Sequence, residues 1–293
     1  MRTILLDPDE TGLEAAAAAL RSGQLVAFPT ETVYGLAASA SDPEAVAAVF
    51  RAKGRPADHP LIVHLAEAGQ LTHWTSAQGR VLKRAELLAR AFWPGPLTLV
   101  VPRSAAALDE VTGGQDTVAL RVPAHAVARQ LLQRSGLALV APSANRFGRI
   151  SPTRAEHVLA DLDGLIPFIV RGSSPEVGVE STIVDVSGPD VRVLRPGVVL
   201  PGQLQDVLGE LVHSGARRAS PRVSGSLSGH YAPGVPLTLV PAGTAGPVET
   251  GVAVVASRPA PAGFSGLWRQ LPAEPDGYAR DLYAVLHELD AVA

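Results

Sequence analysis

The feature that most constrains the fold is the alternation, along the first 212 residues, of short apolar runs with longer segments of helical pattern. Short runs rich in Val, Ile and Leu and bounded by Gly, Pro or polar residues are typical of buried strands. Strands are expected at 24–28, 60–65, 97–101, 117–122, 137–140, 166–170, 181–186 and 191–194. Helices are expected at 11–23, 41–54, 80–92, 125–134, from 151 onwards and at 203–212. The alternation predicts an α/β domain with a twisted mixed sheet flanked by helices.

Local signals suggest where three of these helices begin. Thr11 followed by Glu14 reads as a capping box, and Ser41-Asp42-Pro43-Glu44 and Ser151-Pro152 combine a capping residue with a proline suited to the first turn. We therefore expect helices to start at these residues.

A change of composition divides the chain. Residues 213–236 are rich in Ser, Gly, Arg and Pro, which predicts a linker between a first domain (1–212) and a small unit (237–293). The small unit is expected to hold strands at 237–240 and 252–256 and a helix at 279–289. A unit of this size is marginal for a core of its own, so we expect it to pack against the first domain.

Composition excludes several classes of protein. The chain has no cysteine, so disulfides, thiol nucleophiles and cysteine metal sites are ruled out. A formal net charge of −3 argues against a surface coated in basic charge for nucleic acid. Nothing resembles a signal peptide, and no apolar run approaches the ~18 residues of a membrane span, so the cytoplasm is the expected location.

Polar residues gather directly after the first buried strand, in Phe28-Pro-Thr-Glu-Thr-Val-Tyr-Gly-Leu36. Thr30, Glu31 and Thr32 follow the strand's carboxyl end, where open α/β sheets tend to bind ligands. By itself the stretch could equally be a strand followed by a polar turn.

A second stretch, Arg51-Ala-Lys53-Gly-Arg55, places three cations where a helix is expected to end. These could converge on phosphate or carboxylate oxygens, or could be a favourable basic helix terminus. Lys53 and Lys83 are the only lysines of an arginine-rich chain, which draws attention to Lys53.

Later strands also end near polar residues. Thr117 and Arg121 lie four apart on one strand and should face the same side. An arginine in an apolar strand needs an anion, supplied either by a ligand carboxylate or by a protein acid. The segments Ala141-Pro-Ser-Ala-Asn145, Gly178-Val-Glu-Ser-Thr182 and Leu194-Arg-Pro-Gly197 repeat the pattern, which predicts a cleft for a polar anion. A GxxxxGK[ST] phosphate loop and a GxGxxG motif are both lacking, so side-chain cations would have to hold any phosphates.

Taken in order, these motifs resemble those of the YrdC-like threonylcarbamoyl-AMP synthases of the longer, two-domain kind. The resemblance also rests on Lys53-Gly-Arg-Pro56, Pro60-Leu-Ile-Val-His64, Trp93-Pro-Gly-Pro-Leu-Thr98, Arg121-Val-Pro123 and the linker motif His230-Tyr-Ala-Pro233. It implies condensation of L-threonine, bicarbonate and ATP to threonylcarbamoyl-AMP and pyrophosphate, with Mg²⁺ accompanying ATP. It further implies a functional link to a tRNA threonylcarbamoyl transferase, allows a weak tRNA contact, and implies a linker that crosses the active site.

The resemblance also implies roles for individual residues, with no protein ligands to a metal. L-threonine would be held by Thr32, His64, Arg121, Ala141 and Ser181, and ATP by Arg55, His59, Thr117, Ser143, Ser151, Arg195 and Tyr231. Lys53 and Arg55 would act catalytically by stabilising charge on the phosphate. Two departures stand out: His59 replaces the asparagine common in the family, and the unit after residue 237 is shorter than usual.

Two other functions fit the same fold. One is a non-catalytic RNA- or ribosome-binding factor, against which the net negative charge argues. The other is a carbamoyl-transfer module of larger maturation proteins, which carry zinc fingers that a cysteine-free chain cannot form.

Overall fold

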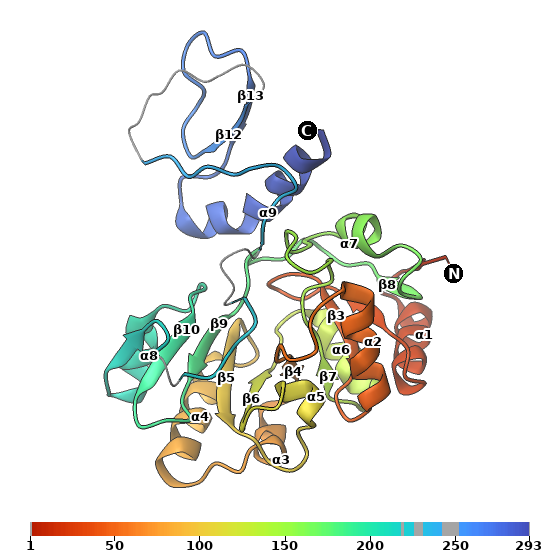
Figure 1. Cartoon of the computed structure of the whole chain (residues 1–293), viewed down its shortest axis with the longest axis vertical. Helices are drawn as coiled ribbons and strands as arrows, with labels where there is room; N and C mark the ends of the chain where they lie inside the picture. Colours follow the sequence, from red (N-terminus) through yellow and green to blue (C-terminus); the bar gives the residue numbers. More distant parts are fainter. Residues whose placement is uncertain (1, 218–219, 226–230, 242–251, 293) are drawn as a thin grey trace.

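The computed structural model describes residues 2–217, 220–225, 231–241 and 252–292. In the described part, eleven strands form one mixed sheet, in the order β1-β8-β2-β3-β7-β4-β6-β5-β9-β10-β11 (Figure 1). The strands are β1 (Ile4–Leu6), β2 (Val26–Phe28), β3 (Gly35–Ser39), β4 (Ile62–His64), β5 (Leu97–Pro102), β6 (Thr117–Arg121), β7 (Leu139–Val140), β8 (Phe168–Val170), β9 (Thr182–Asp185), β10 (Val191–Arg195) and β11 (Val212–Ser214). Parallel and antiparallel neighbours both occur, which confirms the predicted mixed α/β fold.

Helices pack against both faces of this sheet. The helices of the sheet domain are α1 (Glu10–Arg21), α2 (Pro43–Lys53), α3 (Leu71–Trp74), α4 (Gly79–Phe92), α5 (Asp109–Thr112), α6 (Ala126–Ser135), α7 (Ala155–Leu162) and α8 (Pro201–Leu208), with a 3-10 turn at Ala68–Gln70. The larger core packs α2, α4, α7 and α8 against one face. A second core packs α1 and α6 against β2, β3, β7 and β8 on the other face.

Within the described residues, no helix packs on the second face over β4, β6, β5 and β9. Alternation along each strand explains the division, because Leu97, Leu99 and Val101 of β5 point into the larger core while Thr98 and Val100 point the other way. On the helix-free half, Val223 from the segment after β11 packs against Ile62 and Ile183. This helix-free half-face, made by β4, β6, β5 and β9, carries the candidate site.

Several local expectations were wrong in detail. Asp9 caps α1 by accepting a hydrogen bond from the Gly12 amide, in place of Thr11, and Arg154 precedes α7 in place of Ser151. The helix expected at 203–212 ends at Leu208, since Val212–Ser214 pairs with β10 as β11. Strand β3 was missed because its small residues follow a stretch that had been interpreted as a loop.

The C-terminal unit contains a separate two-stranded sheet of β12 (Ala253–Ala256) and β13 (Leu267–Gln270), followed by α9 (Pro275–Val292). In Figure 1 this unit lies at one end of the molecule, with α9 nearest the sheet domain. The strand expected at 237–240 is absent, and these residues are exposed coil. Within the described residues, no helix combines the length and the apolar character needed to cross a membrane.

Candidate functional site

The candidate site lies on the helix-free half-face, along one edge. Because β4, β6 and β10 run opposite to β5 and β9, the carboxyl ends of the first three meet the amino ends of the other two. His64, Arg121 and Arg195 close their strands, whereas Thr98 and Ser181 lie at strand starts. Ser181 thus precedes a strand, and the mixed sheet supplies polar groups from both kinds of strand end.

A buried ion pair joins the first motif to β6. Arg121 Nη2 donates to Glu31 Oε1 at 2.6 Å, and both side chains are 5% exposed. Glu31 also accepts from the amide of Ala124 at 3.0 Å. Burial raises the pKa of the Glu31 carboxyl, but the charge and hydrogen bonds of Arg121 outweigh this effect and leave that pKa below its usual range. The anion beside Arg121 is therefore a protein acid.

Arg121 still has donors to offer. Its Nε donates to the Gly95 carbonyl at 3.2 Å and its Nη1 to Thr32 Oγ1 at 3.0 Å. A guanidinium has five N–H groups, so two remain after these bonds and the bond to Glu31. Arg121 can consequently hold a ligand carboxylate while Glu31 and Thr32 fix its orientation.

His64 lies beside Arg121 in the register of β4 and β6. Its Nδ1 is 3.3 Å from the Ile62 carbonyl, which can only accept, so Nδ1 carries the proton and Nε2 is an acceptor without a partner among the described residues. Burial, and then the charge of Arg121, lowers the pKa of His64 to about 3. His64 is thus a neutral acceptor at physiological pH.

Two further arginines meet at Ser224. Arg55 Nη1 reaches Ser224 Oγ at 3.4 Å, and Arg195 Nη1 donates to the Ser224 carbonyl at 3.1 Å. Both are buried, and within the described residues neither forms an ion pair with a carboxylate. Arg55 Nε has no partner in the described part of the chain. Burial lowers the pKa of Arg55 to about 10, which leaves it charged at neutral pH. Two guanidiniums without a carboxylate partner among the described residues leave positive charge here, which could hold an anion.

Lys53 does not share that anion site. Its Nζ donates to the carbonyls of Ser143 and Asn145, at 2.5 and 2.6 Å. Burial is the main cause that lowers the pKa of Lys53 to about 7, and the charge of Arg55 adds to it. Arg51 is exposed and lines a separate hollow with Gly23 and Leu165. The three cations of the basic motif therefore diverge.

The remaining predicted residues lie around these two centres. Ser181 Oγ is 2.8 Å from Thr98 Oγ1 and accepts from Arg195, and Tyr231 accepts from Arg195 at 3.3 Å. Ser151 donates to Glu180.

His59 follows the basic motif in the chain, and its ring packs edge-on against that of Phe147. The guanidinium of Arg55 lies over the same Phe147 ring. Ala141 is buried beside β4, to which its amide is bonded, and Ser143 forms an isolated bridge with Gly35. His230 of the linker motif lies outside the described residues.

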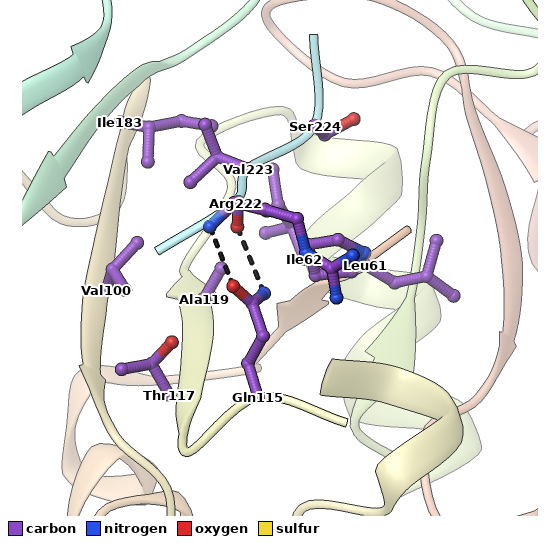
Figure 2. A pocket seen from close by; sticks show the side chains of 11 residues that line it. Leu61, Ile62, Val100, Gln115, Thr117, Ala119, Ile183, Arg222, Val223 and Ser224 are labelled. Carbon is purple, nitrogen blue, oxygen red and sulfur yellow. Dashed lines mark hydrogen bonds between the residues drawn. The ribbon is translucent and has the colours of Figure 1, made fainter. Parts of the chain in front are cut away.

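The segment after β11 is fastened across the half-face. Figure 2 shows the Gln115 side-chain amide bonded to both backbone groups of Arg222: Oε1 accepts from the Arg222 amide at 2.7 Å, and Nε2 donates to its carbonyl at 3.1 Å. Thr117 lines the space beneath Val223, a cavity of about 10 Å³ that has room for roughly one water molecule. The segment thus fills the half-face here and covers Thr117, and a ligand could bind at the polar edge beside it.

Sequence reasoning missed several members of the site. Glu31 was noted only as a polar residue, and Thr98, Glu180, Gln115 and Ser224 were given no role. A buried arginine is a signal for a nearby acid, but it does not say which acid.

Two known protein families match consecutive parts of the chain. Residues 18–197 match the Sua5/YciO/YrdC family, described as telomere recombination, and residues 199–293 match the family described as threonylcarbamoyl-AMP synthase, C-terminal domain.

Individual relatives span most of the chain. The threonylcarbamoyl-AMP synthases of Pyrococcus abyssi and Bacillus subtilis are each 44% identical, over 79% and 80% of this chain and 68% of each relative. The crystal structure of P. abyssi Sua5 complexed with L-threonine has a TM-score of 0.85 at 34% identity, covering 99% of this chain and 90% of that one. The chain belongs to the Sua5/YciO/YrdC family.

Proposed function

We propose that this protein is an enzyme that makes L-threonylcarbamoyladenylate from L-threonine, bicarbonate and ATP, with release of pyrophosphate, for the threonylcarbamoyl-adenosine modification of tRNA. The observation that carries the proposal is the pair of buried, uncompensated guanidiniums, Arg55 and Arg195, close to a second polar centre around Arg121. One centre suits phosphates and the other suits an amino-acid carboxylate. The P. abyssi and B. subtilis relatives are named threonylcarbamoyl-AMP synthases, which supports the same product.

The two centres suggest how the substrates are divided. Thr32, His64, Arg121, Ala141 and Ser181 are the proposed threonine residues, with the two free N–H groups of Arg121 on the carboxylate. The proposed nucleotide residues are Arg55, His59, Thr117, Ser143, Ser151, Arg195 and Tyr231. Mg²⁺ would be carried by the phosphate oxygens, since no cluster of three acidic or histidine side chains occurs within the described residues.

The reaction needs positioning more than covalent catalysis. The threonine amine attacks the carbon of bicarbonate with loss of water, or of CO₂ with loss of a proton, to give a carbamate. A carbamate oxygen then attacks the α-phosphorus while pyrophosphate leaves. Arg55 is proposed to act catalytically by direct contact with the phosphates, and Lys53 as a positioning residue through its hold on the 143–145 loop.

The proposal includes the organisation of the chain and its partners. Residues 1–212 would form the catalytic domain, 213–236 a linker crossing the active site and 237–293 a small second domain, and Val223 and Ser224 against the half-face support the linker's path. As the family's activity requires, the product would pass to a separate tRNA threonylcarbamoyl transferase. The cytoplasm stays a prediction.

Pyrophosphate release from ATP tests the function. We expect release only when both L-threonine and bicarbonate are present. Turnover indifferent to threonine would indicate another acceptor, and salt-sensitive RNA binding without turnover would indicate the non-catalytic alternative.

Matched variants test the anion site. Arg55→Gln should lower kcat/KM for ATP by about 10- to 100-fold, because a hydrogen-bonded charge is lost, whereas the exposed Arg51→Gln should not change it. Equal kcat/KM values for the two variants would contradict the assignment.

A further inference from the structure

One face of α9 lies against the edge of the sheet domain. Arg280, Tyr283, His287 and Asp290 are spaced three, four and three residues apart, which places them on one side of the helix. Each contacts a residue of the first 235, and these residues include the loop that carries Ser151.

The contact at Arg280 is made by backbone. Gly178 has φ +75°, and a Cβ placed there would lie 2.2 Å from the Arg280 carbonyl oxygen. Only glycine satisfies both the backbone angle and this approach. The segment leading to Glu180 and Ser181 is thus packed directly on the helix.

Tyr283 and His287 reach the loop of Ser151 by two routes. Tyr283 donates to Glu180 Oε2 at 2.7 Å, and Ser151 Oγ donates to the other carboxylate oxygen. His287 Nε2 lies 3.1 Å from the Ser151 carbonyl. Ser151 is fully buried and Tyr283 is 7% exposed, so these bonds are shielded from water.

Asp290 ties the same helix to the end of the linker. Its carboxylate accepts from the Gly234 and Val235 amides, at 2.6 and 3.2 Å, and is 3.2 Å from Arg149 Nη2. The ring of Tyr231, three residues before Gly234, is 6.1 Å from that of Tyr283. Helix α9 therefore borders the site from Ser151 to the linker.

The hydrogen bond from Ser151 to Glu180 has a chemical consequence. It commits the only proton of the Ser151 hydroxyl, so that the oxygen can offer only its lone pairs to a ligand. Phosphate oxygens are acceptors and cannot use them. A ribose hydroxyl or the adenine amino group can.

We propose that α9 is a wall of the nucleotide site, in which Tyr283 positions Glu180 so that Ser151 recognises a hydrogen-bond donor on the nucleoside. The inference rests on the proposed function in that Ser151, which is 0% exposed in this structure, is taken to contact ATP once the nucleotide has entered the site. Tyr283 and Glu180 are positioning residues, because they act on the nucleotide through Ser151.

Calorimetric binding of ATP, 2′-deoxy-ATP, 3′-deoxy-ATP and ITP tests this inference. Wild-type protein should bind one of the three analogues about 5- to 10-fold more weakly than ATP, since one hydrogen bond is lost. A deoxy analogue would identify a ribose hydroxyl as the donor, and ITP would identify the amino group. Tyr283→Phe should weaken ATP binding by a similar factor and abolish that discrimination, and Tyr278→Phe on the same helix should do neither.

A second variant and a double mutant guard against a purely structural effect. Glu180→Gln should reproduce the loss of discrimination. In a Ser151→Ala background, Tyr283→Phe should weaken ATP binding little further, because the effects of coupled residues are not additive. Equal weakening of all four nucleotides, or full additivity, would overturn the proposal, as would wild-type protein that binds no ATP. Discriminating ATP binding without pyrophosphate formation would support the wall and reject only the proposed reaction.

Discussion

The tetrapeptide Leu-Thr-Leu-Val occurs twice in this chain with opposite fates. At 97–100 it forms most of β5, where Leu97, Thr98 and Leu99 are completely buried. At 237–240 it is exposed coil, in which Leu239 is 95% exposed. The local sequence is identical, so local propensity cannot explain the difference.

Neighbouring strands explain it. The first copy pairs with β6 on one side and β9 on the other, and α4 packs beneath it. The second copy belongs to neither β12 nor β13, the two strands that pair in the described part of the C-terminal unit. Whether this tetrapeptide is buried therefore depends on partner strands that distant residues contribute. Residues of one type should accordingly respond differently to substitution when they are buried in the sheet domain and when they are exposed.

The largest contrast is expected for the two leucines. Leu99→Ala should lower the free energy of unfolding by about 4 kcal/mol, because it removes buried methyl groups and leaves a cavity in a central strand. Leu239→Ala should leave it unchanged. Denaturant titration of both variants measures the difference, and equal losses would mean that 237–240 is buried in solution.

The fold was largely predictable because a buried strand has a local signature. The runs at 97–101 and 117–122 correspond to β5 and β6 within a residue or so. The second copy of the tetrapeptide carries the same signature without the partners, which is why a strand was wrongly expected at 237–240.

The site was predictable in its residue types more than in its pairings. Arg121 in an apolar strand required an anion, but its partner Glu31 lies 90 residues earlier. Tyr283 meets Glu180 across 103 residues, and nothing in the local sequence announces that contact. Such pairings are set by tertiary structure.

The second contrast concerns two glutamates paired with arginines. Glu31→Ala leaves Arg121 buried without its anion and should lower the free energy of unfolding by about 3 kcal/mol, at the lower end for a broken buried pair because Thr32 and Gly95 remain bonded to it. It should also raise KM for threonine.

Glu288 is the matched residue in the C-terminal unit, where it pairs with Arg269 on the surface. Glu288→Ala should change neither quantity, because solvent screens exposed pairs. Thermal unfolding and steady-state kinetics of both variants test the contrast, and a stable Glu31→Ala protein with normal KM would refute the role given to the buried pair.

The smallest contrast separates the chain's two lysines and depends on pH. Burial lowers the pKa of Lys53 to about 7, from an ordinary value of 10.5. Between these values the unfolded chain holds a proton that the folded protein lacks, so stability rises with pH, by at most about 1.4 kcal/mol per unit. The neutral amine keeps two N–H donors, enough for the Ser143 and Asn145 carbonyls.

Lys53→Met removes this dependence, whereas Lys83→Met, at an exposed position of α4, should keep it. Denaturant titrations at pH 7.5, 8.5 and 9.5 should therefore show that the free energy of unfolding of wild-type protein rises relative to that of Lys53→Met as pH rises. Over the same range, wild-type protein and Lys83→Met should stay parallel. A constant difference between wild-type protein and Lys53→Met would mean that Lys53 stays charged in its buried position, and that the two carbonyls hold an ammonium group.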